Sequence, residues 1–116
     1  MEILNPAALK NLLEMVGGDT EFIAELVNVF FGEAPKMLSE MRQALESKDA
    51  TLLHRAAHSL KSSSAEFGAL ALSDSCRELE KMGRDSVFSG ADELLERAKA
   101  EYAQAKAALE TMCQNL

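Results

Sequence analysis

The chain is organised around one stretch of sequence, which reads His54-Arg55-Ala56-Ala57-His58-Ser59-Leu60-Lys61-Ser62-Ser63-Ser64. Read as a helix, it places two histidines, an arginine, a lysine and several small residues on one side. The other side carries an apolar seam with spacings of four and three, which is typical of a helix buried in a bundle. The seam consists of Leu53, Ala57, Leu60, Ser64 and Phe67. The chain contains only these two histidines, so any imidazole chemistry must occur here.

Working outward, apolar residues recur at helical spacing in four other segments. Asn5 with Pro6, Asp19 or Thr20, and Asp49 are typical residues of a helix start, and Ser89 with Asp92 resembles a capping box. Gly17-Gly18, Gly68 and Gly83 are typical of helix ends. The predicted helices cover residues 6–16, 20–47, 50–67, 70–83 and 90–116.

One detail of these helices leaves an alternative open, and one seam stands out as the most regular. Pro35 lies inside the second helix, where it would either kink or break it. One bent helix is preferred, because the apolar period continues across Pro35. The last helix has the most regular seam, which runs from Leu95 to Leu116.

The fold predicted from this pattern is all-α. We expect an antiparallel up-down-up-down four-helix bundle with a short additional N-terminal helix, forming a single domain over residues 1–116. The length is sufficient for one hydrophobic core, and the alanine-, leucine- and glutamate-rich composition is typical of helical proteins.

The formal net charge of −7 makes nucleic-acid binding unfavourable. The charge is uneven, because residues 51–85 hold five basic and five acidic side chains. A less acidic patch on an acidic protein suits an acidic partner surface. Cys76 and Cys113 form no paired motif, and no signal peptide or membrane-spanning run is recognised. We therefore expect a cytoplasmic chain, and the initial methionine slightly favours a free-standing one.

Helical geometry turns His58 about 180° away from the buried seam, so we expect it to face solvent. Its neighbours include two cations and two residues too small to shield the ring. Within about 60° of His58 on the helix lie His54, Arg55, Lys61, Ser62 and Ala65.

Neutral imidazole is a good nucleophile near neutral pH. Lys61 and Arg55 can stabilise the charge on a transferred phosphoryl group. The alternative without any chemistry is that both histidines are ordinary surface residues on a solvated helix. A metal site is a further alternative, since histidines at i and i+4 can share an ion, but no glutamate directly follows His54, as it would in the zincin motif.

The stretch His58-Ser59-Leu60-Lys61, followed by small residues and Phe67-Gly68-Ala69, resembles the signature of histidine-containing phosphotransfer (HPt) domains. Cys76-Arg77-Glu78-Leu79-Glu80 is similar to the partner segment on that family's next helix. The resemblance extends over most of the chain and includes its length, helix count and histidine placement.

The resemblance implies a role for three residues. His58 would accept a phosphoryl group on Nε2, and Lys61 would neutralise the phosphoryl oxygens. Glu80 would hydrogen-bond His58 Nδ1 and orient the ring; the alternative is a surface acid paired with one of the nearby cations. Ser62 departs from the glycine of many members, but it is also small.

We therefore predict a phosphorelay intermediate without kinase activity. It would take a phosphoryl group from a receiver-domain phospho-aspartate and pass it to a second receiver, in a pathway fed by a hybrid sensor histidine kinase. Mg²⁺ would be held by the receiver, and this chain would bind no cofactor.

A helical interaction module is the competing hypothesis, and a monomer is expected. Two groups of residues would form the partner-binding surface. The first group surrounds His58 and consists of His54, Arg55, Ser62 and Ala65. The second is a basic stripe of Arg77, Lys81 and Arg84, for which the alternative is an ordinary solvated helix face.

Overall fold

The computed structural model describes residues 3–116, which form five α-helices and no strand. The predictions of an all-helical chain and of a short first helix are confirmed. The helices are α1 (Pro6–Met15), α2 (Thr20–Ser47), α3 (Ala50–Glu66), α4 (Leu70–Asp85) and α5 (Ala91–Gln114).

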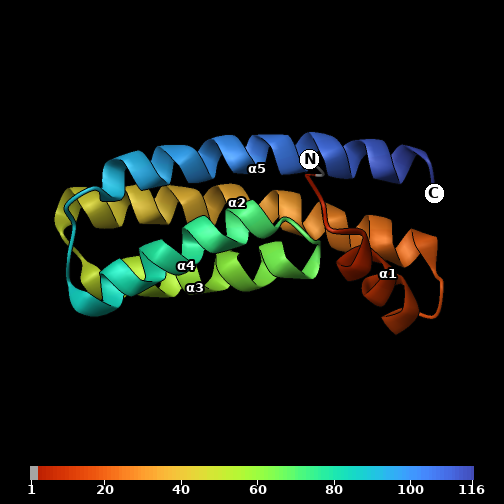
Figure 1. The fold of residues 1–116 in the computed structure, drawn as a ribbon, viewed down its shortest axis with the longest axis horizontal. Coiled ribbons are helices and arrows are strands. Elements are labelled where there is room, and N and C mark those ends of the chain that lie inside the picture. The colour runs from red at the N-terminus through yellow and green to blue at the C-terminus, as the bar shows by residue number, and fades with distance from the viewer. Residues whose placement is uncertain (1–2) are drawn as a thin grey trace.

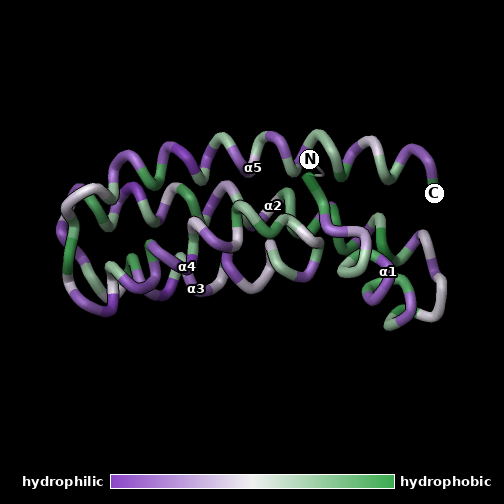
Figure 2. The backbone as a smooth tube through the Cα atoms, in the orientation of Figure 1, coloured by the Kyte–Doolittle hydropathy of each residue, from purple (hydrophilic) through white to green (hydrophobic). Residues whose placement is uncertain are grey.

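The four longer helices lie lengthwise beside one another, and α1 lies near the end at which α2 begins (Figure 1). α3 packs on α2 and α4, and α5 packs on the same two helices. Hydrophobic and hydrophilic stretches alternate along each long helix (Figure 2), as expected when one face of each helix is buried. Within residues 3–116, the helices lack the combination of length and apolar character needed to cross a membrane.

Three helix starts are capped by the predicted side chains. The Oδ1 atoms of Asn5, Asp19 and Asp49 each accept a hydrogen bond from a backbone N–H in the following turn, at 2.8, 3.1 and 3.0 Å. Each bond satisfies one of the N–H groups that lack a partner inside the helix. These local signals therefore set the starts of α1, α2 and α3.

The capping box predicted from Ser89 and Asp92 is wrong. Gly90, with φ of 83°, occupies the cap position of α5, and no side chain caps this helix. Asp92 Oδ1 instead accepts a hydrogen bond from Arg42 Nη1 of α2 at 2.7 Å. The carboxylate thus ties α5 to α2, a contact between residues far apart in sequence.

α2 continues through Pro35 as one helix, as predicted. Proline removes one backbone hydrogen bond. The apolar face nevertheless continues on both sides, with Phe30 and Ala34 buried before Pro35 and Leu38 and Met41 buried after it. Burial along the whole helix outweighs the single lost bond.

The predicted seam of α5 is correct in its middle and too long at its end. Leu95, Tyr102 and Leu109 are buried, whereas Met112 is only partly buried and Leu116 is 50% exposed. α3 and α4 do not reach the C-terminal end of α5 (Figure 1). The last turn therefore lacks the neighbours that bury the rest of the seam.

Gly83 does not end the fourth helix, contrary to prediction, because α4 continues to Asp85. The residue is buried inside α4 against the start of α3. A Cβ atom at this position would lie 2.6 Å from the backbone nitrogen of His54 and 2.9 Å from the carbonyl oxygen of Ala50. Glycine therefore allows the two helix backbones to approach closely here.

We predict that Gly83→Ala destabilises the protein. Alanine normally stabilises a helix interior by about 0.5–1 kcal/mol relative to glycine, but here its Cβ would force α3 and α4 apart, at a net loss of about 1–3 kcal/mol. The matched control is Gly32→Ala in α2, where an added Cβ meets no atom within 4 Å and stability should rise. Urea unfolding followed by circular dichroism measures both. Equal stability of the two variants would contradict the close approach.

Candidate functional site

α3 presents His58 on its exposed side, and 58% of the side chain is accessible to solvent. On the opposite side of the helix, Leu53, Ala57 and Leu60 are fully buried. This is the orientation that the apolar seam predicts. The ring is therefore held on a packed helix while remaining open to another molecule.

The carboxylate of Glu80 lies between two side chains of α3. Its Oε2 lies 2.5 Å from His58 Nδ1, and its Oε1 accepts a hydrogen bond from Lys61 Nζ at 2.6 Å. Glu80 belongs to α4 and is only 15% exposed. The packing of α4 on α3 thus assembles a cluster from three residues that are separated by up to 22 positions in sequence.

Glu80 is held in its ionised form. Burial alone would raise the pKa of its carboxyl group, but hydrogen bonds from Lys61 and His58 and their positive charges outweigh burial and lower the pKa below its usual range. Both oxygens therefore act only as hydrogen-bond acceptors at neutral pH.

The ionised carboxylate determines which nitrogen of His58 is free. Because Glu80 can only accept, His58 Nδ1 carries the proton and donates it. In the neutral ring, Nε2 then carries the lone pair. The nitrogen with the lone pair is then the one that points away from Glu80, on a largely exposed ring.

His54 lies at the edge of this cluster. Its Nε2 is 3.8 Å from Glu80 Oε2, which is too far for a hydrogen bond. Its ring lies nearly parallel to that of His58, with centroids 6.3 Å apart and an interplanar angle of 10°. The structure therefore brings His54 beside the cluster without joining it to Glu80.

The remaining predicted residues are exposed on the same two helices. Arg55, Ser62 and Ala65 lie on α3, and the basic stripe of Arg77, Lys81 and Arg84 lies on α4. Neither arginine of the stripe pairs with Glu80, since Arg77 pairs with Asp74 and Arg84 with Asp85. A surface groove of about 540 Å³ lies along the contact between the two helices, and it is lined by His54, Lys61, Arg77, Glu78, Glu80, Lys81 and Arg84.

Two residues that support the site were missed from the sequence. Ser73 Oγ of α4 donates a hydrogen bond to the carbonyl oxygen of Lys61 at 3.0 Å, and Gly83 lies against the backbone of His54. A glycine inside an otherwise helical pattern is a signal of close backbone approach. The signal was available for Gly83, whereas nothing in the sequence distinguishes Ser73 from other serines.

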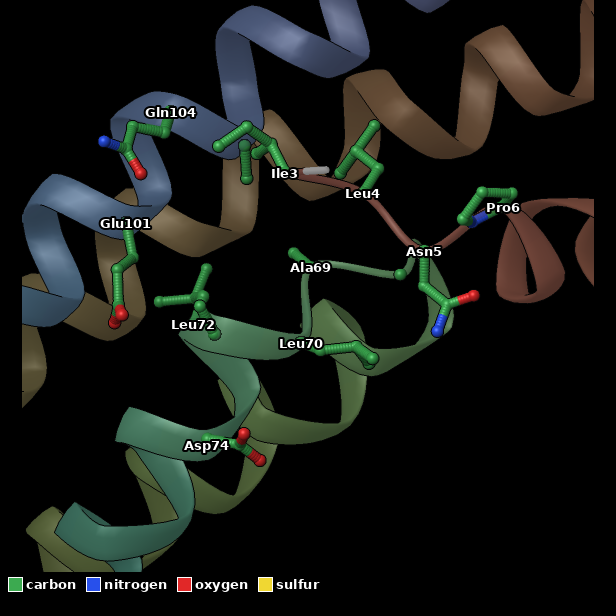
Figure 3. Close-up of a pocket in the computed structure, with 13 residues that line it drawn as sticks. Ile3, Leu4, Asn5, Pro6, Ala69, Leu70, Leu72, Asp74, Glu101 and Gln104 are labelled. Carbon is green, nitrogen blue, oxygen red and sulfur yellow. The ribbon is translucent and has the colours of Figure 1, made fainter. Parts of the chain in front are cut away.

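A second cavity, of about 530 Å³, lies between the N-terminal segment, the turn after α3, and α5 (Figure 3). The backbone nitrogen of Asn5 donates to the carbonyl oxygen of Gly68 at 2.8 Å and holds the segment on this turn. None of the predicted site residues lines this cavity. Within residues 3–116, we find no group of three or more histidine, cysteine, aspartate or glutamate side chains arranged to hold one metal ion.

The chain is similar in sequence to known phosphorelay and phosphotransfer proteins. The chain is 32% identical over 85 residues to the phosphorelay protein LuxU of Vibrio vulnificus, covering 73% of this chain and 72% of LuxU. It is 26% identical over 98 residues to histidine-containing phosphotransfer protein 2 of Arabidopsis thaliana, covering 82% of this chain. The match spans only 63% of the Arabidopsis protein.

Solved structures and a family model give the same relationship. The crystal structure of histidine-containing phosphotransfer protein B (HptB) from Pseudomonas aeruginosa PAO1 superposes with a TM-score of 0.89 at 27% identity, covering 98% of this chain and 96% of HptB. The family model described as "Hpt domain" matches residues 25–116, which include the whole cluster. The chain therefore belongs to the Hpt domain family.

Proposed function

We propose that this chain is a phosphorelay intermediate in which His58 Nε2 carries the phosphoryl group. The observation that carries the proposal is the 2.5 Å contact between His58 Nδ1 and the Glu80 carboxylate. It keeps the proton on Nδ1 and leaves the exposed Nε2 with its lone pair. Membership of the Hpt domain family supports this chemistry over an interaction module with incidental histidines.

In the first transfer, the lone pair of Nε2 attacks the phosphorus of a receiver-domain aspartyl phosphate. A P–N bond forms while the P–O bond to the aspartate breaks, and the aspartate leaves as a carboxylate. The ring then carries positive charge, which the ionised Glu80 stabilises through Nδ1–H. In the second transfer, the carboxylate of another receiver aspartate attacks phosphorus, and the His58 imidazole leaves.

We assign to Lys61 the neutralisation of the phosphoryl oxygens. It follows His58 by one turn on the exposed side of α3, and its Nζ is held by Glu80 Oε1. Phosphoryl transfer depends mainly on positioning and charge stabilisation, which a nearby ammonium group supplies. We assign Mg²⁺ to the carboxylates of the receiver domain, so this chain supplies the histidine, the lysine and the ring-orienting Glu80.

The partners in this proposal are receiver domains and a hybrid sensor histidine kinase, and the chain itself is a carrier without kinase activity. We propose that the receiver docks on the residues that surround His58 on α3, which are His54, Arg55, Ser62 and Ala65.

Lengthwise packing and short connections support an antiparallel up-down-up-down arrangement of α2 to α5. A single domain over residues 1–116, a monomeric state, a cytoplasmic location and the absence of nucleic-acid binding remain predictions.

The assignment of His58 predicts the outcome of a labelling experiment. A receiver domain carrying a radioactive aspartyl phosphate should transfer an acid-labile, base-stable label to the wild-type chain. His58→Gln should abolish this label, because no other side chain of the cluster offers a free imidazole nitrogen beside Lys61. The matched control is His54→Gln, which should keep the label. Label on His58→Gln, or its loss in His54→Gln alone, would move the site to another residue.

The role of Lys61 predicts a change in transfer rate. Lys61→Ala should slow transfer from the receiver by roughly tenfold or more, which corresponds to the loss of one charged hydrogen bond to the phosphoryl group. Lys61→Arg should recover part of the rate because it keeps the charge. Rapid-quench measurement of labelled His58 gives the rates. Equal rates for wild type and Lys61→Ala would show that the lysine does not contact the transferred group.

The role of Glu80 predicts the tautomer of His58. In ¹⁵N-labelled wild type at alkaline pH, long-range ¹H–¹⁵N correlation spectra should show the proton on Nδ1. Glu80→Ala should shift the population towards the Nε2–H form and slow transfer. Glu80→Gln is the conservative control, because its amide oxygen can still accept from Nδ1–H. An unchanged tautomer in Glu80→Ala would remove the proposed orienting role.

A further inference from the structure

The groove beside the cluster has an excess of positive charge on a protein of net charge −7. Among residues 3–116, the groove is lined by four cations, Lys61, Arg77, Lys81 and Arg84, and by two carboxylates. Glu80 is engaged by Lys61 and His58, as described above. The other carboxylate, that of Glu78, lies 3.9 Å from Arg97 of α5. The negative charges of Glu78 and Glu80 are thus partly balanced by residues outside the basic stripe.

The stripe itself is poorly neutralised. Arg77 and Arg84 pair only with exposed neighbours on their own helix, at 3.2 Å each, and such exposed pairs contribute little. For Lys81, no carboxylate oxygen lies within 4 Å of Nζ among residues 3–116. A partner that supplies carboxylates would therefore find cations that are available for pairing.

Helix electrostatics give no reason of their own for the stripe. Arg84 lies in the last turn of α4, where a cation interacts favourably with the helix dipole. Arg77 and Lys81 repel each other as like charges at i and i+4. Asp74 attracts Arg77, and Glu78 attracts Lys81, each at a spacing of three residues, which offsets this repulsion. The local contributions are therefore roughly balanced.

The position of the groove indicates which molecule would fill it. His54 and Lys61 line it, and these residues flank His58 on α3, one turn before and one turn after it. A protein that reaches His58 Nε2 must therefore cover the adjoining part of the groove. Nucleic acid is a poor alternative occupant, because the net charge of the chain repels a phosphate backbone.

We propose that the groove between α3 and α4 binds carboxylate side chains of the receiver domain that docks over His58, with Arg77 and Lys81 as the residues that select acidic receivers. The proposal rests on the proposed function and extends it from chemistry to partner choice. Charges at the rim of an interface act mainly on association rate and its salt dependence. The stripe therefore sets which receiver binds, whereas Lys61 and Glu80 act on the transfer step.

The test uses Arg77→Glu/Lys81→Glu in the full chain. From a panel of receiver domains phosphorylated with acetyl phosphate, the receiver that transfers label fastest to wild type serves as the probe. The variant should raise the KM for this phospho-receiver by about tenfold or more. Its kcat should stay near the wild-type value, and its KM should depend less on salt concentration. Arg77→Gln/Lys81→Gln should give a smaller change in the same direction.

The matched control is Lys36→Glu/Lys99→Glu, which makes the same change in net charge on α2 and α5. Both lysines are exposed and form ordinary i, i+3 ion pairs at 3.7 Å. An equal rise in KM for the control and stripe variants would overturn the proposal, because net charge alone would then explain the effect. A fall in kcat with unchanged KM would also overturn it, since the stripe would then act on chemistry.

A separate measurement distinguishes failure of the groove from failure of the site. Phosphoramidate can transfer its phosphoryl group to a histidine nitrogen with release of ammonia, without any protein partner. Labelling of His58 by phosphoramidate in wild type and in the stripe variant, together with the KM effect, supports both proposals. Labelling without a KM effect overturns the groove alone. Absence of labelling in wild type overturns the proposed function, and with it the receiver as occupant of the groove.

Discussion

The site depends on the close approach of α3 and α4. At Gly83 the backbones are so close that a Cβ would lie 2.6 Å from the backbone nitrogen of His54. One turn earlier on α4, the same spacing brings the Glu80 carboxylate within hydrogen-bond distance of both His58 and Lys61. A glutamate side chain on a more distant helix would not reach both partners with one carboxylate. The short distance between the helices therefore allows Glu80 to hold the His58 ring, and Gly83 is the small residue that permits this distance.

Ser64 and Ser73 are small polar residues of these helices, and both are buried. Ser64 of α3 is fully buried, and its hydroxyl finds no hydrogen-bond partner within residues 3–116. The small size of serine therefore explains its presence at this position better than its polarity does. Ser73 of α4 is buried as well, but its hydroxyl donates to the carbonyl oxygen of Lys61. Ser73 thereby ties α4 to the turn of α3 that carries the lysine.

Much of this arrangement follows from the sequence because it is local. The buried seam of α3 predicts that His58 faces solvent, and polar residues such as Asp49 predict where helices start. The errors concern contacts between helices. Asp92 resembles part of a capping box, but Arg42, fifty positions away in sequence, binds its carboxylate. Gly83 resembles a helix end, yet it is required by a neighbouring backbone that the helical period does not reveal.

The two histidines differ in how they approach Glu80. His54 and His58 lie one turn apart on the same face of α3, and both approach the same oxygen of Glu80. His58 approaches with Nδ1, the nitrogen nearer the helix backbone, and so leaves Nε2 at the exposed tip of the ring. His54 faces the same oxygen with Nε2 at 3.8 Å, which is beyond hydrogen-bond distance, so Glu80 does not hold its ring. Under the proposed function, this difference assigns the phosphoryl group to His58, whose Nδ1 is bound by Glu80, and leaves His54 as a neighbour.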